Sequence, residues 1–126
     1  GDVQLTLCQK TELTGAIVVS TPQDVALLDA RKALDIFSTL HTPVLGMIEN
    51  MSQYICPECG HEAHIFGHGG VELEAKKLGI PFLGSLPLDL SVRLAGDSGT
   101  PVAMGDGPVA QAYADLAAGL IASDIA

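Results

Sequence analysis

Cys56 and Cys59 stand two residues apart in the sequence Cys-Pro-Glu-Cys-Gly. A tight turn at this spacing places both thiolates on one side, where they can bind one metal ion or cluster. One such pair supplies half of a four-thiolate site, so the other ligands have to come from elsewhere. The remaining cysteine, Cys8, lies in an apolar segment and suits a small buried side chain better than a ligand. An unligated turn is the alternative interpretation of the pair.

Three histidines, His61, His64 and His68, follow the cysteine pair closely. His61 and His64 could close a zinc site with the two cysteines within one chain. The spacing is cramped, because common zinc modules separate their ligand pairs by about a dozen residues or more. Solvated loop histidines are therefore the simpler interpretation. A non-catalytic zinc-binding interaction domain stays as the alternative function.

The composition restricts the class of partner. The chain has 126 residues, with 15 acidic and 6 basic side chains and a formal charge of −9. This length suits one domain with a hydrophobic core. Nucleic acid and anionic membranes attract clustered Lys and Arg, so we expect neither as a partner. No apolar run is long enough to span a bilayer, and we expect no signal peptide. A reduced thiol pair then predicts a cytoplasmic protein.

The elements that must position these residues follow from runs and periods of apolar side chains. Continuous aliphatic runs predict three strands buried on both faces, at residues 15–20, 44–48 and 81–86. Apolar positions three and four apart predict helices at residues 21–40, 70–78 and 109–121. Thr21 is the expected N-cap of the first helix, and Gly79 is the expected stop of the second. Residues 2–10 fit a strand or a helix, and residues 97–108 are expected to be loop.

Strands that alternate with helices predict an α/β fold with a parallel sheet, whose ligands bind outside the carboxyl ends of the strands. Asn50 and residues 87–89 lie there. The Asn50 amide suits an adenine edge, although closing a turn is the simpler role from spacing alone. Residues 67–70 precede a helix but lack the lysine of a phosphate-binding loop. A sheet of three strands has two unpaired edges, and the sequence begins with Gly1 rather than Met. We therefore expect more of this domain upstream, or a partner.

Several motifs together resemble one known family. They are Met-Ile-Glu-Asn-Met-Ser at 47–52, Cys-Pro-Glu-Cys at 56–59, Ile-Phe-Gly-His-Gly-Gly at 65–70, Pro-Phe-Leu-Gly at 81–84, Pro-Leu-Asp at 87–89 and Val-Arg at 92–93. This set is similar to the C-terminal half of the Mrp/ApbC-type P-loop ATPases, which are related to the MinD-like ATPases and are scaffolds or carriers for iron–sulfur clusters. Residues 1–7 resemble the segment just past the family's Walker B motif.

The resemblance implies a fold and a place for nucleotide. Residues 1–126 would form the C-terminal part of a single domain, a partial doubly wound parallel sheet with a metal-binding loop at about residues 50–69. The N-terminal P-loop half would be absent. Asp2 matches the family's switch aspartate, and Asn50 matches its adenine-contacting asparagine. The family's loop along the base is matched by Pro87, Leu88 and Asp89.

The resemblance also implies cargo and partners. Cys56 and Cys59 would hold a [4Fe–4S] cluster that bridges the two chains of a homodimer, or zinc in the protein as purified. Apo iron–sulfur proteins would be the clients of such a carrier or assembly ATPase. ATP and Mg²⁺ are expected in the full-length protein. Because the chain contains neither a Walker A nor a Walker B motif, ATP hydrolysis is expected only of the parent protein.

Overall fold

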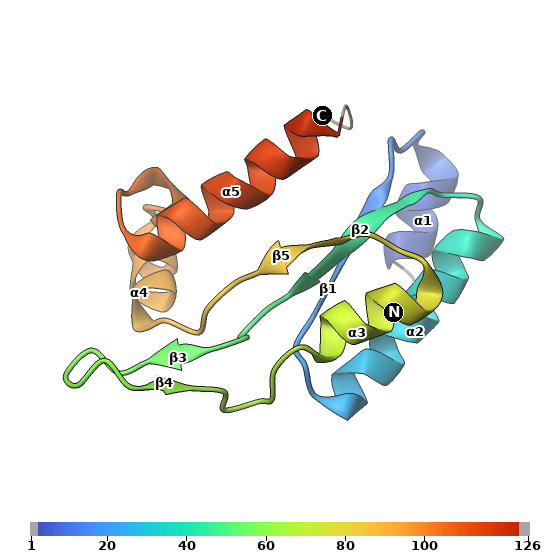
Figure 1. The fold of residues 1–126 in the computed structure, drawn as a ribbon. Coiled ribbons are helices and arrows are strands. Elements are labelled where there is room, and N and C mark those ends of the chain that lie inside the picture. Colours follow the sequence, from blue (N-terminus) through green and yellow to red (C-terminus); the bar gives the residue numbers. More distant parts are fainter. Residues whose placement is uncertain (1–2, 124–126) are drawn as a thin grey trace.

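A three-stranded parallel sheet is the centre of the fold in the computed structural model, which describes residues 3–123. Its strands lie in the order β1-β2-β5 and span Ala16–Ser20, Val44–Glu49 and Phe82–Ser85, respectively. The register pairs Val18 with Met47, and Met47 with Phe82. The predicted parallel α/β arrangement is therefore confirmed. A separate two-stranded antiparallel ribbon, β3-β4, projects beyond this sheet (Figure 1).

Helices cover both faces of the sheet. The helical segments are α1 at Val3–Lys10, α2 at Asp24–Thr39, α3 at Gly70–Leu78, α4 at Leu90–Ser98, the 3-10 helix η1 at Val102–Met104, and α5 at Pro108–Ala122. Figure 1 shows α2 and α3 together on one face and α5 on the opposite face. At Gly84 in β5, a Cβ would lie 2.7 Å from Cδ2 of Leu116, so glycine permits the close approach of α5. Among residues 3–123, no helix combines the length and the apolar character needed to cross a membrane.

The core lies between the sheet and the α2–α3 layer. Its buried members are aliphatic side chains and one methionine: Val18, Leu27, Ala30, Leu34, Met47, Val71 and Ala75. Met47, a member of this cluster, is completely buried. The predicted stop of α3 is confirmed, because Gly79 takes a left-handed conformation (φ 70°) that glycine adopts without strain. Residues 2–10, which the sequence left ambiguous, are helical from Val3.

Three details of the sequence prediction are wrong. Thr21 is not the cap of α2, which begins at Asp24 after Gln23; the Thr21 hydroxyl donates to the Gln23 side chain instead (3.0 Å). β1 is not buried on both faces, since Val19 is 55% exposed. The helix on that face, α5, packs against β5 at the far edge of the sheet and leaves β1 open. Residues 97–108 are not all loop, because α4 extends through Ser98 and η1 spans Val102–Met104; the rest of α4 lies where the sequence predicted no element.

An ion pair joins α2 to α3. Arg31 donates from Nε and Nη2 to the two carboxylate oxygens of Glu74, the second bond being 2.8 Å long. Glu74 is buried and Arg31 is half-exposed. The hydrogen bonds from Arg31 hold the pKa of Glu74 below its ordinary value. The pair therefore stabilises the packing of the two helices that cover the core.

Removing this ion pair should weaken the fold most at neutral pH. A carboxyl with a lowered folded-state pKa stabilises above its unfolded pKa and loses that contribution as the pH falls below about 4. Glu74→Gln is expected to lower the Tm at pH 7, and the difference from wild type should shrink as the pH falls through that range. Circular-dichroism melts across pH measure it, with the exposed Glu72→Gln on the same helix as control. A difference that stays constant with pH would contradict this assignment.

Candidate functional site

The cysteine pair occupies the tip of the β3-β4 hairpin. Strands β3 (Tyr54–Ile55) and β4 (Glu62–Ala63) pair antiparallel, and Cys56 N–H donates to the carbonyl of His61 (2.9 Å). Gly60 N–H donates a hydrogen bond to the carbonyl of Cys56 (2.8 Å). The φ of Gly60 is 74°, a left-handed conformation that glycine adopts without strain. The sequence indicated a loop here but not these two strands. The turn between β3 and β4, which contains Cys56 and Cys59, projects away from the body of the fold (Figure 1).

The turn prepares the Cys56 sulfur to bind metal. Cys56 is half-buried, Cys59 is exposed, and both are free thiols. The pKa of Cys56 is lowered because the backbone N–H groups of Cys59 and then Glu58, and the Cys59 thiol, donate hydrogen bonds to its sulfur. The thiolate is the form that ligates metals. Two thiols in one turn are a donor set that fits a thiophilic metal or an iron–sulfur cluster.

His61 lies in the turn of the hairpin, whereas His64 and His68 lie at its base, after β4. His64 Nδ1 is 3.0 Å from the carbonyl oxygen of Ser52, and the His64 and His68 ring centroids are 4.3 Å apart. His68 Nδ1 in turn lies 4.0 Å from Oε2 of Glu49. Within residues 3–123, no three His, Cys, Asp or Glu side chains gather in a way that could hold a metal. The alternative zinc site of the two cysteines with His61 and His64 is therefore not assembled in this structure.

The carboxyl ends of β2 and β5 form a second candidate site. A cavity of about 230 Å³ lies there, lined by Asn50, Met51, Pro87, Leu88, Asp89, Val92, Arg93 and Tyr113. Asn50 and the Pro87–Asp89 segment therefore come together, as their positions after parallel strands predict. Met51 has a φ of 53°, a left-handed conformation that residues other than glycine adopt rarely. Asp2, the other residue expected at this site, lies outside the described residues.

Asp89 has a structural partner of its own. It is the N-cap of α4, and its Oδ1 accepts from the backbone N–H of Ser91 (2.8 Å). Hydrogen bonds from the Ser91 hydroxyl and then from its N–H lower the pKa of Asp89. A cap of this kind positions the first turn of a helix. Asp89 therefore holds α4, whose Val92 and Arg93 line the same cavity.

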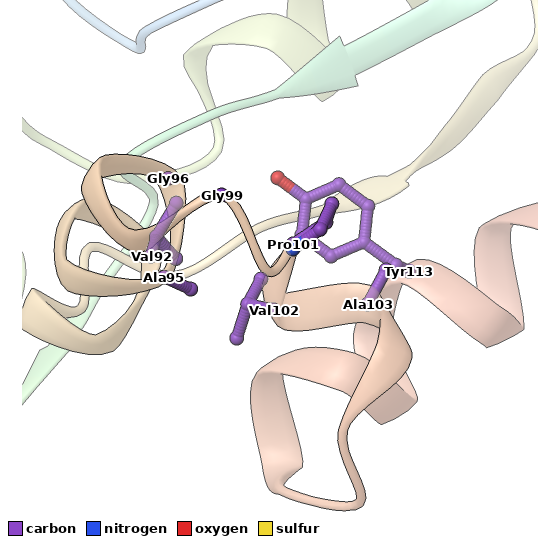
Figure 2. A pocket seen from close by; sticks show the side chains of 8 residues that line it. All are labelled: Val92, Ala95, Gly96, Gly99, Pro101, Val102, Ala103 and Tyr113. Atoms are coloured by element: carbon purple, nitrogen blue, oxygen red, sulfur yellow. The ribbon is translucent and has the colours of Figure 1, made fainter.

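Glu49, Ser52 and Tyr113 lie at or beside these sites, but the sequence predicted no role for any of them. Glu49 is 1% exposed at the end of β2, and an acidic residue that ends an aliphatic run was the signal available. Tyr113 lies between the Asn50 cavity and a second, apolar one of about 350 Å³ between α4, η1 and α5. Figure 2 shows Tyr113 and Pro101 among the side chains that line that apolar cavity. The described residues that line it include no carboxylate, thiol or imidazole, so it offers no strong metal ligand.

Comparison with known proteins decides the family. Residues 1–121 match the model of the ParA family described as NUBPL iron-transfer P-loop NTPase. The chain belongs to this family. Among its NUBPL-type relatives are the iron–sulfur cluster carrier protein of Pseudomonas fragi (49% identity, 93% of this chain and 42% of the relative) and the iron–sulfur cluster transfer protein NUBPL of Dictyostelium discoideum (46% identity, 96% and 38%). The resemblance read from the motifs is thus confirmed.

Solved structures give the same fold. The nucleotide-binding protein of Archaeoglobus fulgidus in complex with ADP superimposes with a TM-score of 0.68 at 36% identity, over 79% of this chain and 41% of that one. The cell division ATPase MinD of Pyrococcus furiosus superimposes with a TM-score of 0.68 at 20% identity, over 87% and 43%. The three-stranded parallel sheet is thus part of a P-loop NTPase fold. The chain spans less than half the length of each of these relatives.

Proposed function

We propose that this chain is the cluster-binding part of an iron–sulfur cluster carrier ATPase. The observation that carries the proposal is the hairpin that presents Cys56 and Cys59 at its tip, with the Cys56 thiolate stabilised by backbone N–H groups. Relatives at 46–49% identity are named as iron–sulfur cluster carrier or transfer proteins, which supports the same cargo. Free thiols suit a reducing compartment, and we place the protein in the cytoplasm.

Two thiolates leave a [4Fe–4S] cluster half-ligated, so the other two must come from another chain. No third ligand lies with the pair among the described residues, which favours a second copy of the same hairpin. The cluster would then bridge a homodimer. Its solvent-exposed position at Cys59 suits a cargo that has to be passed on to apo iron–sulfur proteins.

The Asn50 cavity is the proposed nucleotide side of the protein. Asn50 can donate to and accept from an adenine edge, while Pro87 and Leu88 offer apolar surface to a base. A solved relative at 36% identity is in complex with ADP. Phosphates, Mg²⁺ and hydrolysis would require the P-loop of the whole protein, together with the switch aspartate that we propose for Asp2.

Anaerobic reconstitution with iron and sulfide tests the cargo. The expected product is a brown dimer with about four irons per two chains, the stoichiometry of one bridging four-thiolate cluster. Iron analysis, visible absorbance and light scattering on the same sample measure it. A colourless protein that binds zinc as a monomer would contradict the proposal, because Zn²⁺ does not absorb visible light.

A further inference from the structure

Glu49 is a buried carboxylate that holds both ends of the loop carrying the cysteines. Its Oε2 accepts from the hydroxyl of Ser52 at the start of the loop (2.5 Å). Its Oε1 accepts from the backbone N–H of Val71 at the end of the loop (3.2 Å), and Oε2 lies 3.4 Å from the N–H of Gly69. One side chain thus joins two segments about 20 residues apart in sequence.

Glu49 also stands next to the nucleotide side. Asn50 follows it directly, and Asn50 N–H donates to the carbonyl of Ser20 in β1 (2.8 Å). The backbone of the hairpin base is bonded to the segment after β5: Ser52 N–H donates to the Leu86 carbonyl (3.0 Å), and Leu88 N–H donates to the Gln53 carbonyl (2.8 Å). If Asn50 or Leu88 moves when a base binds, these backbone hydrogen bonds would therefore carry the movement to the hairpin.

The hydrogen bonds of Glu49 to the two ends of the loop are unfavourable to break, because its carboxylate is buried. Glu49 is 1% exposed, so a lost partner could not readily be replaced by water. The first turn of α3 favours a negative charge at its N-terminus, where Val71 lies. At the end of the loop, a Cβ on Gly70 would lie 2.9 Å from the Pro22 carbonyl oxygen, so this segment has little room to shift by itself.

We propose that Glu49 is the positioning residue that couples the nucleotide side to the metal hairpin. Its carboxylate accepts hydrogen bonds from both Ser52 and Val71. A displacement of Asn50 would therefore also move the base of the hairpin that carries Cys56 and Cys59. The inference rests on the proposed function, since it links the nucleotide side and the thiol pair named there. It assigns to Glu49 no contact with nucleotide or cluster.

Hydrogen–deuterium exchange on the whole, metal-free protein tests this coupling, with Mg²⁺–ADP as the probe. In wild type, ADP is expected to change exchange in residues 53–69 by about fivefold or more, the lower range of typical coupling between sites. In Glu49→Gln, which keeps the shape and one acceptor oxygen, that ratio should fall toward one while ADP still binds by calorimetry. A wild-type ratio in this variant, or no ADP effect in wild type, would overturn the proposal.

Two further variants separate coupling from simple loosening. Glu74→Gln removes another buried carboxylate from α3, outside the loop, and should keep the ADP-dependent ratio. If it loses the ratio too, general destabilisation explains the effect and the proposal fails. If Glu49→Gln does not fold, Ser52→Ala breaks one end of the connection, and an unchanged ratio there refutes the role. Because no metal is present, failure to assemble a cluster would sink the proposed function and leave this result standing.

Discussion

Replacing Cys56 or Cys59 by alanine is expected to abolish the visible absorbance of the reconstituted protein and its metal-dependent dimerisation together. Each chain contributes only two thiolates, so losing one leaves a bridging cluster with two of its four ligands removed across the dimer. Cluster binding by two thiolates per chain depends on dimer formation. We therefore expect each substitution to remove all of the bound cluster rather than part of it. Iron content per chain and the mass of the assembly by light scattering measure both effects.

The matched controls lie on the same chain. Cys8→Ala removes a thiol on α1, and His61→Ala removes an imidazole next to the hairpin turn; both should keep colour and dimer. His64→Ala should also keep the metal, since its ring is directed to Ser52 and His68. If His61→Ala or His64→Ala instead releases metal from a monomer, the zinc-binding interaction domain is the correct function.

Met47→Ala is expected to cost about 2–5 kcal/mol of the free energy of unfolding, the largest effect on stability that we predict. The Met47 side chain is completely buried in β2, within the cluster formed by α2 and α3 on the sheet. Truncation removes apolar contact and leaves a cavity that two helices and a sheet cannot easily close. Urea unfolding of the chain, followed by circular dichroism, measures the loss.

Two control variants test whether the loss of stability in Met47→Ala comes from its buried position. Met47→Leu nearly conserves volume and should cost less than about 1.5 kcal/mol. Met104→Ala changes a methionine that is 76% exposed and should stay within about 0.5 kcal/mol of wild type. A loss below about 1 kcal/mol for Met47→Ala would mean that the layer between β2 and the helices does not carry the stability of this domain.

Local patterns were sufficient for most elements. Continuous aliphatic runs located β1, β2 and β5, because strands of a parallel sheet that packs against helices carry apolar side chains on successive residues. Gly79 marked the end of α3, since its left-handed conformation is a property of that single residue. Alternating strands and helices also placed Asn50 beside residues 87–89, because parallel strands end at one edge. The spacing of Cys56 and Cys59 defined a half-site for the same local reason.

Other features depended on partners distant in sequence. The open face at Val19 reflects where α5 packs. No pattern within the loop predicted the β3-β4 hairpin, whose strands are too short to show a period.

The sequence by itself determined the parallel α/β fold, the thiol pair and the family resemblance, because each is written in short runs, spacings or motifs. Only the tertiary structure decided which ionisable groups are enclosed and what they touch. Glu49 appears in the sequence as one acidic residue after an aliphatic run. Its role at the base of the hairpin arises because the fold brings Ser52, Gly69 and Val71 around one buried carboxylate. The fold also directs the His64 ring to the carbonyl of Ser52, at the base of the hairpin and away from its tip.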